Sequence, residues 1–378
     1  MTAVALGICA AFKHHSRPVA AGCSRRVGTV DARVGYGSDK AIETQVERFM
    51  KILVTGASGF IGGRFVRHAL EQGFEVRVNG RRAEGVAHLL RRGAHFVEGD
   101  LSDPHLAQRL CIGVDAVVHC AGATGHWGRA QDFHQHTVQA TENIVEGCLK
   151  EHVRRLVYLS CASVYRNGRS RSGIKEDALP RRFADAATRS RHLAEQKVFG
   201  AAEFGLEVIT LRPAPVLGAG DVSWLPPLIE LQRKQRLSII GNGLNKVDFT
   251  SVQNLTEALS SSLLAEPAAL GKAYNISNGT PIPLWDVLNY VLRQLQMTQV
   301  TRYSHYRSAW LKGALNEGAC LLWPGRPRPR WSRHGAHSLN ADFTLDIARA
   351  RHYLEYEPQT SLWAALDEFC GWWQAQAR

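Results

Sequence analysis

Three glycines at residues 56, 59 and 62 give the chain a segment that could bind phosphate through its backbone. The segment follows an apolar run at residues 52–54 and opens an amphipathic stretch that reaches Gln72. Gly56 permits a tight turn, Gly59 lets the chain approach a pyrophosphate, and Gly62 lets helix and strand pack closely. The alternative is a glycine turn kept only for packing. We expect dinucleotide binding, with these residues at the cofactor: Gly56, Ser58, Gly59, Phe60, Ile61 and Gly62.

The choice between NAD and NADP is made where the second apolar run ends, at Asn79-Gly80-Arg81-Arg82. An acidic side chain at this place accepts hydrogen bonds from the ribose hydroxyls of NAD, whereas a positive charge accommodates the 2′-phosphate of NADP. Arg81 and Arg82 therefore favour NADP, with NAD as the second choice. The alternative is that both arginines are solvated surface residues.

Short apolar runs alternate with longer amphipathic stretches along the chain from residue 51. This alternation predicts an α/β fold, a Rossmann-type doubly wound parallel sheet with helices on both faces, and such folds bind ligands beyond the carboxyl ends of their strands. The expected strands are at 52–54, 75–78, 95–97, 115–119, 155–159 and 207–211, and the expected helices at 60–72, 83–92, 103–111, 131–151 and 186–204.

Over about residues 50–378 the chain resembles the extended short-chain dehydrogenase/reductase superfamily, in its NAD-dependent epimerase/dehydratase and 3β-hydroxysteroid dehydrogenase-like branch. The resemblance rests on the glycine segment and on the motifs at 99–101, 119–123, 159–165, 211–213 and 274–277. It implies that Asp100 contacts the adenine and that Ala121, Gly122 and Ala123 lie beside the nicotinamide half. Leu101 and Pro213 are also expected to bind the cofactor.

Family members act through a Ser-Tyr-Lys group that is usually aided by an Asn. Aligning residues 190–195 with the family's S/T-K-x-x-A-E places Ala187 where the tyrosine belongs and Arg191 where the lysine belongs. Cys161 takes the place of the serine and Thr137 that of the Asn. Arg191 keeps a cation for the nicotinamide ribose, but the methyl group of Ala187 has no proton to give.

Another group would have to supply the proton, and four neighbours of Cys161 or Arg191 in sequence are alternatives to the Cys161 thiol: Ser160, Ser163, Tyr165 and His192. Losing a general acid typically removes a factor of about 100 to 10,000 in rate. The leading hypothesis is an oxidoreductase or epimerase-dehydratase relative that acts on hydroxyl or carbonyl groups. The alternative is a non-catalytic NADP-binding sensor or scaffold.

The resemblance places a smaller substrate-binding lobe at residues 216–244 and 278–378, and a dinucleotide-binding domain at 50–215 that also receives elements from about 245–277. Trp224, Leu225 and residues 125–128 are candidates to face a ligand. The apolar segment 309–323 is expected to be buried against the lobe; a lid or a helix on a membrane surface is the alternative. The apolar residues favour a sterol-like or acyl-like substrate.

The net charge of +12 lies mainly at the periphery of the 378-residue chain. Residues 1–50 hold seven Lys and Arg against four acids, and residues 301–338 hold seven against one. We therefore expect no nucleic-acid partner, and no apolar run is long enough for a transmembrane segment. The cysteines and histidines lack metal spacing, which predicts no metal and a reduced cytoplasmic protein. Residues 1–49 are expected to be a disordered extension, and a homodimer and peripheral membrane contact stay open.

Overall fold

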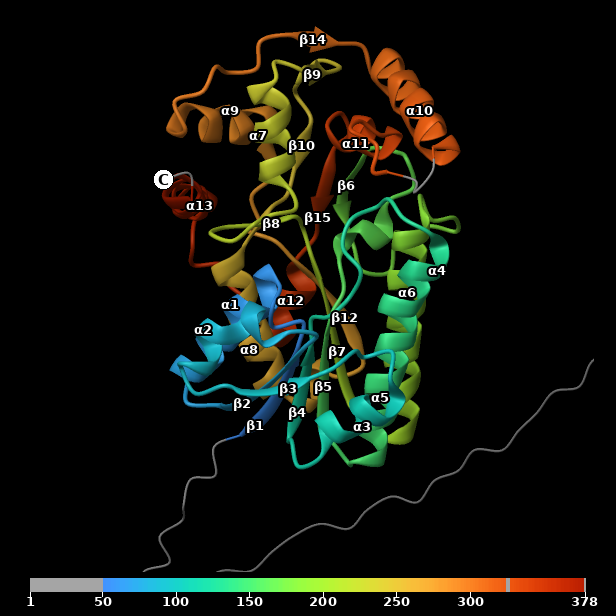
Figure 1. Cartoon of the computed structure of the whole chain (residues 1–378), viewed down its shortest axis with the longest axis vertical. Helices are drawn as coiled ribbons and strands as arrows, with labels where there is room; N and C mark the ends of the chain where they lie inside the picture. The colour runs from blue at the N-terminus through green and yellow to red at the C-terminus, as the bar shows by residue number, and fades with distance from the viewer. Residues whose placement is uncertain (1–49, 324–326, 377–378) are drawn as a thin grey trace, which may run out of the picture. The chain divides into compact units, whose positions relative to one another are not determined.

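Seven parallel strands form the central sheet of the computed structural model, which describes residues 50–323 and 327–376 (Figure 1). In pairing order they are β12 (Lys272–Ile276), β7 (Glu207–Pro213), β5 (Arg155–Leu159), β4 (Ala116–His119), β1 (Lys51–Thr55), β2 (Glu75–Gly80) and β3 (His95–Glu98). The chain runs outward from β1 to β3 and then returns to β4 on the other side of β1. The predicted doubly wound parallel sheet is confirmed, and the reversal between β1 and β4 is where such sheets bind ligands.

The strands bury alternate side chains on opposite faces of the sheet. Ile52 and Val54 belong to the core on one face, while Leu53 between them belongs to the core on the other. The first face is covered by α1 (Phe60–Glu71), α2 (Ala87–Leu90), α8 (Val252–Leu264) and α12 (Ala348–Leu354). The second face is covered by α3 (Pro104–Cys111), α5 (Ala140–Lys150) and α6 (Ala186–Gly200).

A third core lies beyond the carboxyl ends of the strands, where α7 (Leu225–Arg233), α9 (Leu284–Gln294) and α13 (Leu362–Gln376) pack together. In α9 the buried residues Leu284, Val287, Leu288 and Val291 recur at helical spacing, so one face of the helix turns inward. Tyr165 also packs into this core, although it lies within residues 50–215, the range expected for the dinucleotide-binding domain. The boundaries expected for the two domains stay a prediction.

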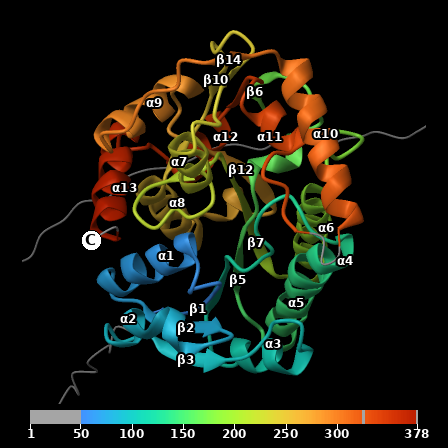
Figure 2. The same cartoon turned by 45° about the horizontal axis from the view of Figure 1, so that its top comes forward.

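Short strands and further helices complete this part of the chain, and Figure 2 shows α9 and α13 on one side of it and α10 on the other. A second sheet pairs β13 (Ile282–Pro283), β10 (Lys246–Val247), β15 (Phe343–Leu345) and β6 (Arg171–Ile174); two small pairs are β8 (Val216–Leu217) with β11 (Thr250–Ser251) and β9 (Ile239–Ile240) with β14 (Tyr303–Ser304). The remaining helices are α4 (Ala130–Phe133), α10 (Tyr306–Leu322) and α11 (Arg333–Ser338). No helix in the described ranges combines the length and the apolar composition that a bilayer crossing requires.

Candidate functional site

The turn between β1 and α1 is shaped by its glycines. Gly56 has a φ of 69°, and a Cβ there would lie 2.8 Å from the backbone nitrogen of Ala121. A Cβ on Gly62 would lie 2.3 Å from the Gly56 carbonyl oxygen, so the helix could not pack as it does. Ser58 and Gly59 are exposed, and no side chain caps the first turn of α1. These features fit the binding of a dinucleotide pyrophosphate at the helix start.

The end of β2 presents two exposed arginines, Arg81 and Arg82. Asn79 before them is buried, and its Nδ2 donates to two backbone carbonyls at the end of β3, at 3.1 and 3.2 Å. Asp100 follows β3, and its Oδ1 accepts a hydrogen bond of 2.9 Å from the backbone of Ser102. This bond lowers the pKa of Asp100, which is therefore ionised at neutral pH. The ends of β2 and β3 could thus hold the adenosine half of a cofactor.

A buried histidine joins the ends of β1 and β4. His119 Nδ1 lies 2.7 Å from Thr55 Oγ1, and its Nε2 lies 3.0 Å from Thr141 Oγ1. Because the Thr141 hydroxyl donates to the Thr137 carbonyl, it must accept from Nε2–H, which leaves Nδ1 to accept from Thr55. Burial lowers the pKa of His119 to about 4, so the ring is neutral. Thr55 Oγ1 also accepts from the Ala121 N–H at 3.3 Å, which fixes the chain after β4.

Thr137, at the family's Asn position, lies in the π-helical turn η2 (His134–Gln139) between α4 and α5. Turns of this kind are frequent at functional sites. Its side chain is 4% exposed, and its Oγ1 accepts from the Ala123 N–H at 3.2 Å. In this structure Thr137 therefore positions the Ala121–Ala123 strip.

The residues after β5 face Arg191 from α6. The Cys161 thiol is half-buried, and its Sγ accepts from the Ser163 backbone at 3.4 Å. Arg191 donates to the Ala123 carbonyl at 3.3 Å and to Ser163 Oγ at 3.5 Å, and so bridges the loops that follow β4 and β5. Ser160 Oγ is buried and has no hydrogen-bond partner among the described residues. It is a hydroxyl that a substrate or cofactor could engage.

Ala187 and Arg191 lie four apart on α6, as the family's Tyr-Lys pair would. Arg191 lines the cleft described below, whereas Ala187 is 2% exposed and does not. The helix therefore presents a cation but no phenol. No proton donor stands at the tyrosine position.

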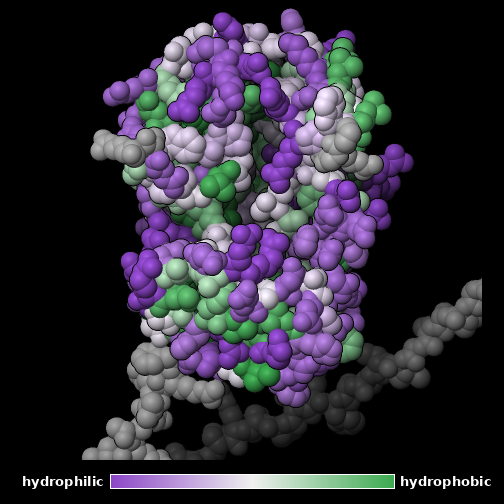
Figure 3. Space-filling model, viewed as in Figure 1, coloured by the Kyte–Doolittle hydropathy of each residue, from purple (hydrophilic) through white to green (hydrophobic). Residues whose placement is uncertain are grey.

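A cleft of about 1040 Å³ opens between the carboxyl ends of the strands and the third core, and the space-filling view shows the hollow (Figure 3). Its floor includes the Ala121–Ala123 strip together with Thr137, Cys161 and Arg191, which the sequence had placed at the cofactor and the reacting atoms. Its apolar walls come from Trp127, Pro213, Trp224, Leu228, Leu231, Phe249, Trp310, Trp331 and Phe343. The cleft is large enough for a nicotinamide end and a substrate together.

Arg166 is a lining residue that sequence reasoning did not single out. Its guanidinium lies 4.4 Å from the centre of the Phe343 ring, and its Nη1 donates to Ser338 Oγ at 3.0 Å. Burial lowers its pKa from the usual value. Within residues 50–323 and 327–376 no carboxylate oxygen approaches Arg166 or Arg191 within 4.0 Å. Neither arginine therefore forms a salt bridge among those residues, although Asp185 of the same cleft acts on Arg166 from farther away and raises its pKa.

Two histidines and an aspartate meet in the same cleft. His126, after β4, and His334, in α11, each place Nδ1 3.4 Å from Asp185 Oδ2, and their rings stack with centres 3.6 Å apart. Asp185 caps α6, with Oδ1 accepting from the Thr188 N–H at 2.8 Å. Burial lowers the pKa of His334 to about 4. Of these three residues only His126, within 125–128, was expected from the sequence to face a ligand. Asp185 and His334 lie far from it in the chain.

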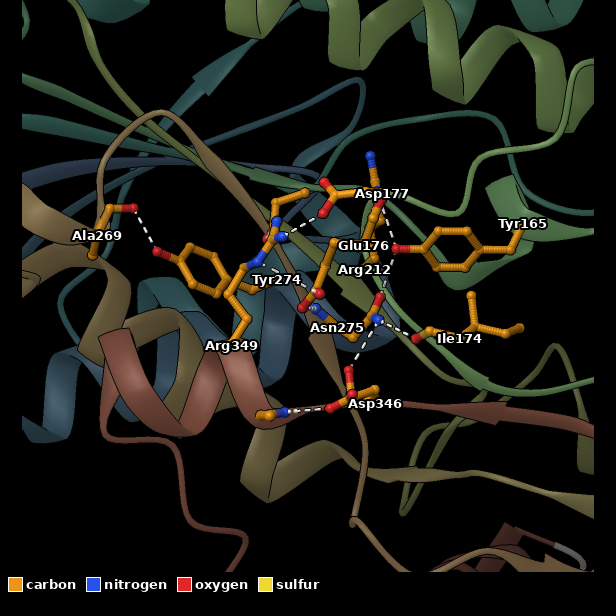
Figure 4. A network of polar contacts seen from close by, with 12 residues as sticks. Tyr165, Ile174, Glu176, Asp177, Arg212, Ala269, Tyr274, Asn275, Asp346 and Arg349 are labelled. Carbon is orange, nitrogen blue, oxygen red and sulfur yellow. Dashed lines mark hydrogen bonds and ion pairs between the residues drawn. The ribbon is translucent and has the colours of Figure 1, made fainter.

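Tyr165 is not available as the stand-in acid that the sequence suggested. Its ring is fully buried, and its hydroxyl donates to Asn275 Oδ1 at 2.7 Å and accepts from Arg212 at 2.8 Å (Figure 4). Burial raises its pKa further above the usual range. Leu225, expected to line the pocket, is instead the fully buried first residue of α7. Trp224 does line the cleft.

The expectation that segment 309–323 is buried against the lobe is wrong for its large side chains. Within α10 the small residues Ala309 and Gly313 are buried. The backbone of Ser332 packs so closely at Gly313 that a Cβ there would lie 2.6 Å from the Ser332 carbonyl carbon. Leu311, Leu315 and other large apolar residues of this segment are exposed. Figure 3 shows apolar surface at the upper right, where α10 lies in the same view. Trp310 reaches the cleft, which agrees with the alternative of a lid.

Comparison with known proteins places this site in a family. Residues 52–277 match the NAD dependent epimerase/dehydratase family. A 2-alkyl-3-oxoalkanoate reductase from Stenotrophomonas maltophilia (strain K279a) is 35% identical over 322 residues, which cover 83% of this chain and 96% of the relative. The sterol-4-alpha-carboxylate 3-dehydrogenase, decarboxylating, of Homo sapiens is 31% identical over 275 residues, 70% of each chain. A UDP-glucuronic acid 4-epimerase from Bacillus cereus, solved with NAD, matches with a TM-score of 0.68 at 20% identity over 87% of this chain and 100% of that one.

The fold and the site define an oxidoreductase-type relative of the extended short-chain dehydrogenases. The chain belongs to the NAD dependent epimerase/dehydratase family. The epimerase structure supports the fold alone, because its identity is low.

Proposed function

We propose that the protein binds NADP and oxidises or reduces a hydroxyl or carbonyl group on an apolar substrate that carries an anionic group. The observation that supports this most strongly is the pair of cleft arginines, Arg166 and Arg191, which form no salt bridge among the described residues and lie among aromatic walls. Both side chains are half-buried, and a cation that is partly removed from water is costly unless it is paired. A carboxylate on the substrate would supply the missing charge at Arg166.

The names of two relatives agree with this substrate class. A 2-alkyl-3-oxoalkanoate and a sterol-4-alpha-carboxylate both carry a carboxylate on the carbon next to the one that is reduced or oxidised. We infer the same arrangement, on an acyl-like or sterol-like body, for the substrate of this chain.

The cofactor assignment rests on residues that fit it. The glycine turn would hold the pyrophosphate, Arg81 and Arg82 the 2′-phosphate, Asp100 the adenosine half, and Arg191 the nicotinamide ribose. When bound, NADPH supplies a hydride and NADP takes one up. The protein's part is to orient the nicotinamide end at the cleft floor and to exclude water from it.

The rival proposal is that the protein is a non-catalytic sensor of the cofactor. It is favoured by Ala187, which stands where the family has its proton-donating tyrosine and does not reach the cleft. Ser160, with its unpartnered hydroxyl, and Cys161 remain as proton sources at the cleft floor. We expect turnover that is slow for the family.

The deciding experiment titrates the protein with NADPH and NADH and then follows cofactor oxidation with long-chain 3-oxo acids and their methyl esters. Preferential NADPH binding, and turnover of the acid that falls at least tenfold for the ester and for Arg166→Ala, would support the proposal. Binding without any turnover would favour the sensor. Failure to bind either cofactor would contradict both.

A further inference from the structure

The cluster of His126, Asp185 and His334 is not needed by the proposed chemistry. His126 comes from the loop after β4, Asp185 is the N-cap residue of α6, and His334 lies in the short helix α11. One donor atom from each, Nδ1, Oδ2 and Nδ1, lies within 4.8 Å of the other two. All three residues line the cleft, so a ligand can reach them.

The two separations between histidine and aspartate match metal coordination better than hydrogen bonding. Both Nδ1 atoms lie 3.4 Å from Asp185 Oδ2. An N–H···O hydrogen bond is typically about 2.7–3.2 Å long, whereas two donors on a tetrahedral ion with bonds of about 2.1 Å stand about 3.4 Å apart. Consistent with this, His126 Nδ1 and Asp185 Oδ2 are buried atoms without a hydrogen-bond partner among the described residues.

A backbone hydrogen bond orients the Asp185 carboxylate toward the place that such an ion would occupy. The Thr188 N–H occupies Asp185 Oδ1 at 2.8 Å, which leaves Oδ2 turned toward the two imidazoles. Bonds of this kind orient metal ligands in proteins. The two imidazole rings are stacked with an interplanar angle of 23°. The χ2 torsion of histidine has a broad range of allowed values, so a modest rotation of each ring points both Nδ1 lone pairs toward one ion.

We propose that His126, Asp185 and His334 bind a divalent transition-metal ion of the zinc class, with a fourth position open to the cleft. Two imidazoles and one carboxylate suit zinc, whereas calcium and magnesium take sets of oxygen ligands. The open position accepts an oxygen donor, either water or a carbonyl or carboxylate of the substrate. Arg166 and Arg191 oppose a cation in the same cleft, so we expect weaker binding than in structural zinc sites.

The test titrates zinc, and separately cobalt(II), into the full chain after treatment with a chelator, using calorimetry and the visible spectrum of bound cobalt. We expect one ion per chain and an affinity that falls at least tenfold in His126→Ala, in His334→Ala and in Asp185→Asn. Asp185→Asn is informative because asparagine still caps a helix while losing the charge. His337→Ala changes another histidine of α11 that lines the cleft, and it should bind zinc as the wild type does.

No uptake at about 100 µM zinc, or uptake that the three substitutions leave unchanged, would overturn the proposal. Uptake abolished by Cys161→Ser with the three substitutions neutral would do the same. Thermal melts without metal show whether each variant is folded. NADPH titration is a separate readout, so a chain that fails to bind cofactor but takes up zinc at this cluster disproves the proposed function and not the metal site.

Discussion

Arg212 and Glu195 form a two-point ion pair inside the molecule. Arg212 Nε lies 2.8 Å from Oε1 of Glu195, and Nη2 lies 2.7 Å from Oε2, with the side chains 3% and 1% exposed. The remaining nitrogen of Arg212 donates to the Tyr165 hydroxyl and to the Glu176 carbonyl (Figure 4). The pair links α6 to β7, and Tyr165 extends the link into the third core.

Glu195→Ala should lower the free energy of unfolding by about 3–5 kcal/mol, because it leaves the Arg212 charge buried and unpaired. Urea denaturation measures the change. The matched control is Glu146→Ala, which removes an exposed partner of Lys150 one helical turn away and should cost less than about 0.5 kcal/mol. Equal losses of unfolding free energy in the two variants would show that the buried ion pair stabilises the protein no more than the exposed one does.

Gly56→Ala should abolish cofactor binding, while Gly113→Ala should not. Both glycines have positive φ, 69° and 65°, so each substitution costs about 1–2 kcal/mol of backbone strain. Only at Gly56 does the new Cβ meet backbone, 2.8 Å from the Ala121 nitrogen; at Gly113 nothing lies within 4 Å. Thermal melts and NADPH fluorescence titrations separate the two effects. Unimpaired binding by Gly56→Ala would rule out the glycine turn as the pyrophosphate site.

His119 should make stability fall as the solution is acidified. Its pKa is lowered by burial from 6.5 to about 4, so the unfolded chain binds a proton more readily than the folded one. The stabilisation is present above pH 6.5 and is lost as the pH falls toward 4, by about 2 kcal/mol between pH 7 and pH 5. The stability difference between wild type and His119→Asn should shrink by that amount on acidification. A difference that stays constant with pH would contradict a neutral buried ring.

Asp248 should have the opposite dependence. Its carboxyl group is 1% exposed, Oδ2 accepts from the Leu345 N–H at 2.7 Å, and Oδ1 has no hydrogen-bond partner among the described residues. Burial raises its pKa from 3.8 to about 6, so stability is lost as the pH rises from 4 through 6. Asp248→Asn should therefore stabilise the protein by about 2–3 kcal/mol at pH 8 and much less at pH 4. Asp132→Asn, on the exposed side of α4, serves as the control in the same melts.

Restoring the family's pair, with Ala187→Tyr and Arg191→Lys together, should raise kcat by about 100-fold or more, because a general acid contributes a factor of that size. Arg191→Lys alone is the control and should give no gain, since it adds no phenol. Ala187 is almost fully buried, so a melt must accompany the kinetics. A folded double variant with unchanged kcat would mean that another group in the cleft already transfers the proton.

Much of the fold was predictable from local patterns. Ile52, Leu53 and Val54 predict a strand because successive side chains of a strand point to opposite faces of the sheet. The glycines at 56 and 62 predict a tight turn, because only a residue without a side chain fits there. Both signals depend on residues that are close together in the chain. The substitutions at Ala187 and Arg191 were equally visible, because the family's spacing on one helix fixes where to look.

The site itself was decided by the tertiary structure. Tyr165 lies close to Cys161 in sequence, yet the fold turns it away from the cleft into the Arg212 network. Asp185 and His334 carry no local signal, and only the packing of α11 over the start of α6 brings them to His126. Sequence patterns encode which face of an element is buried; which distant side chains meet depends on how the elements pack, and no local spacing records that.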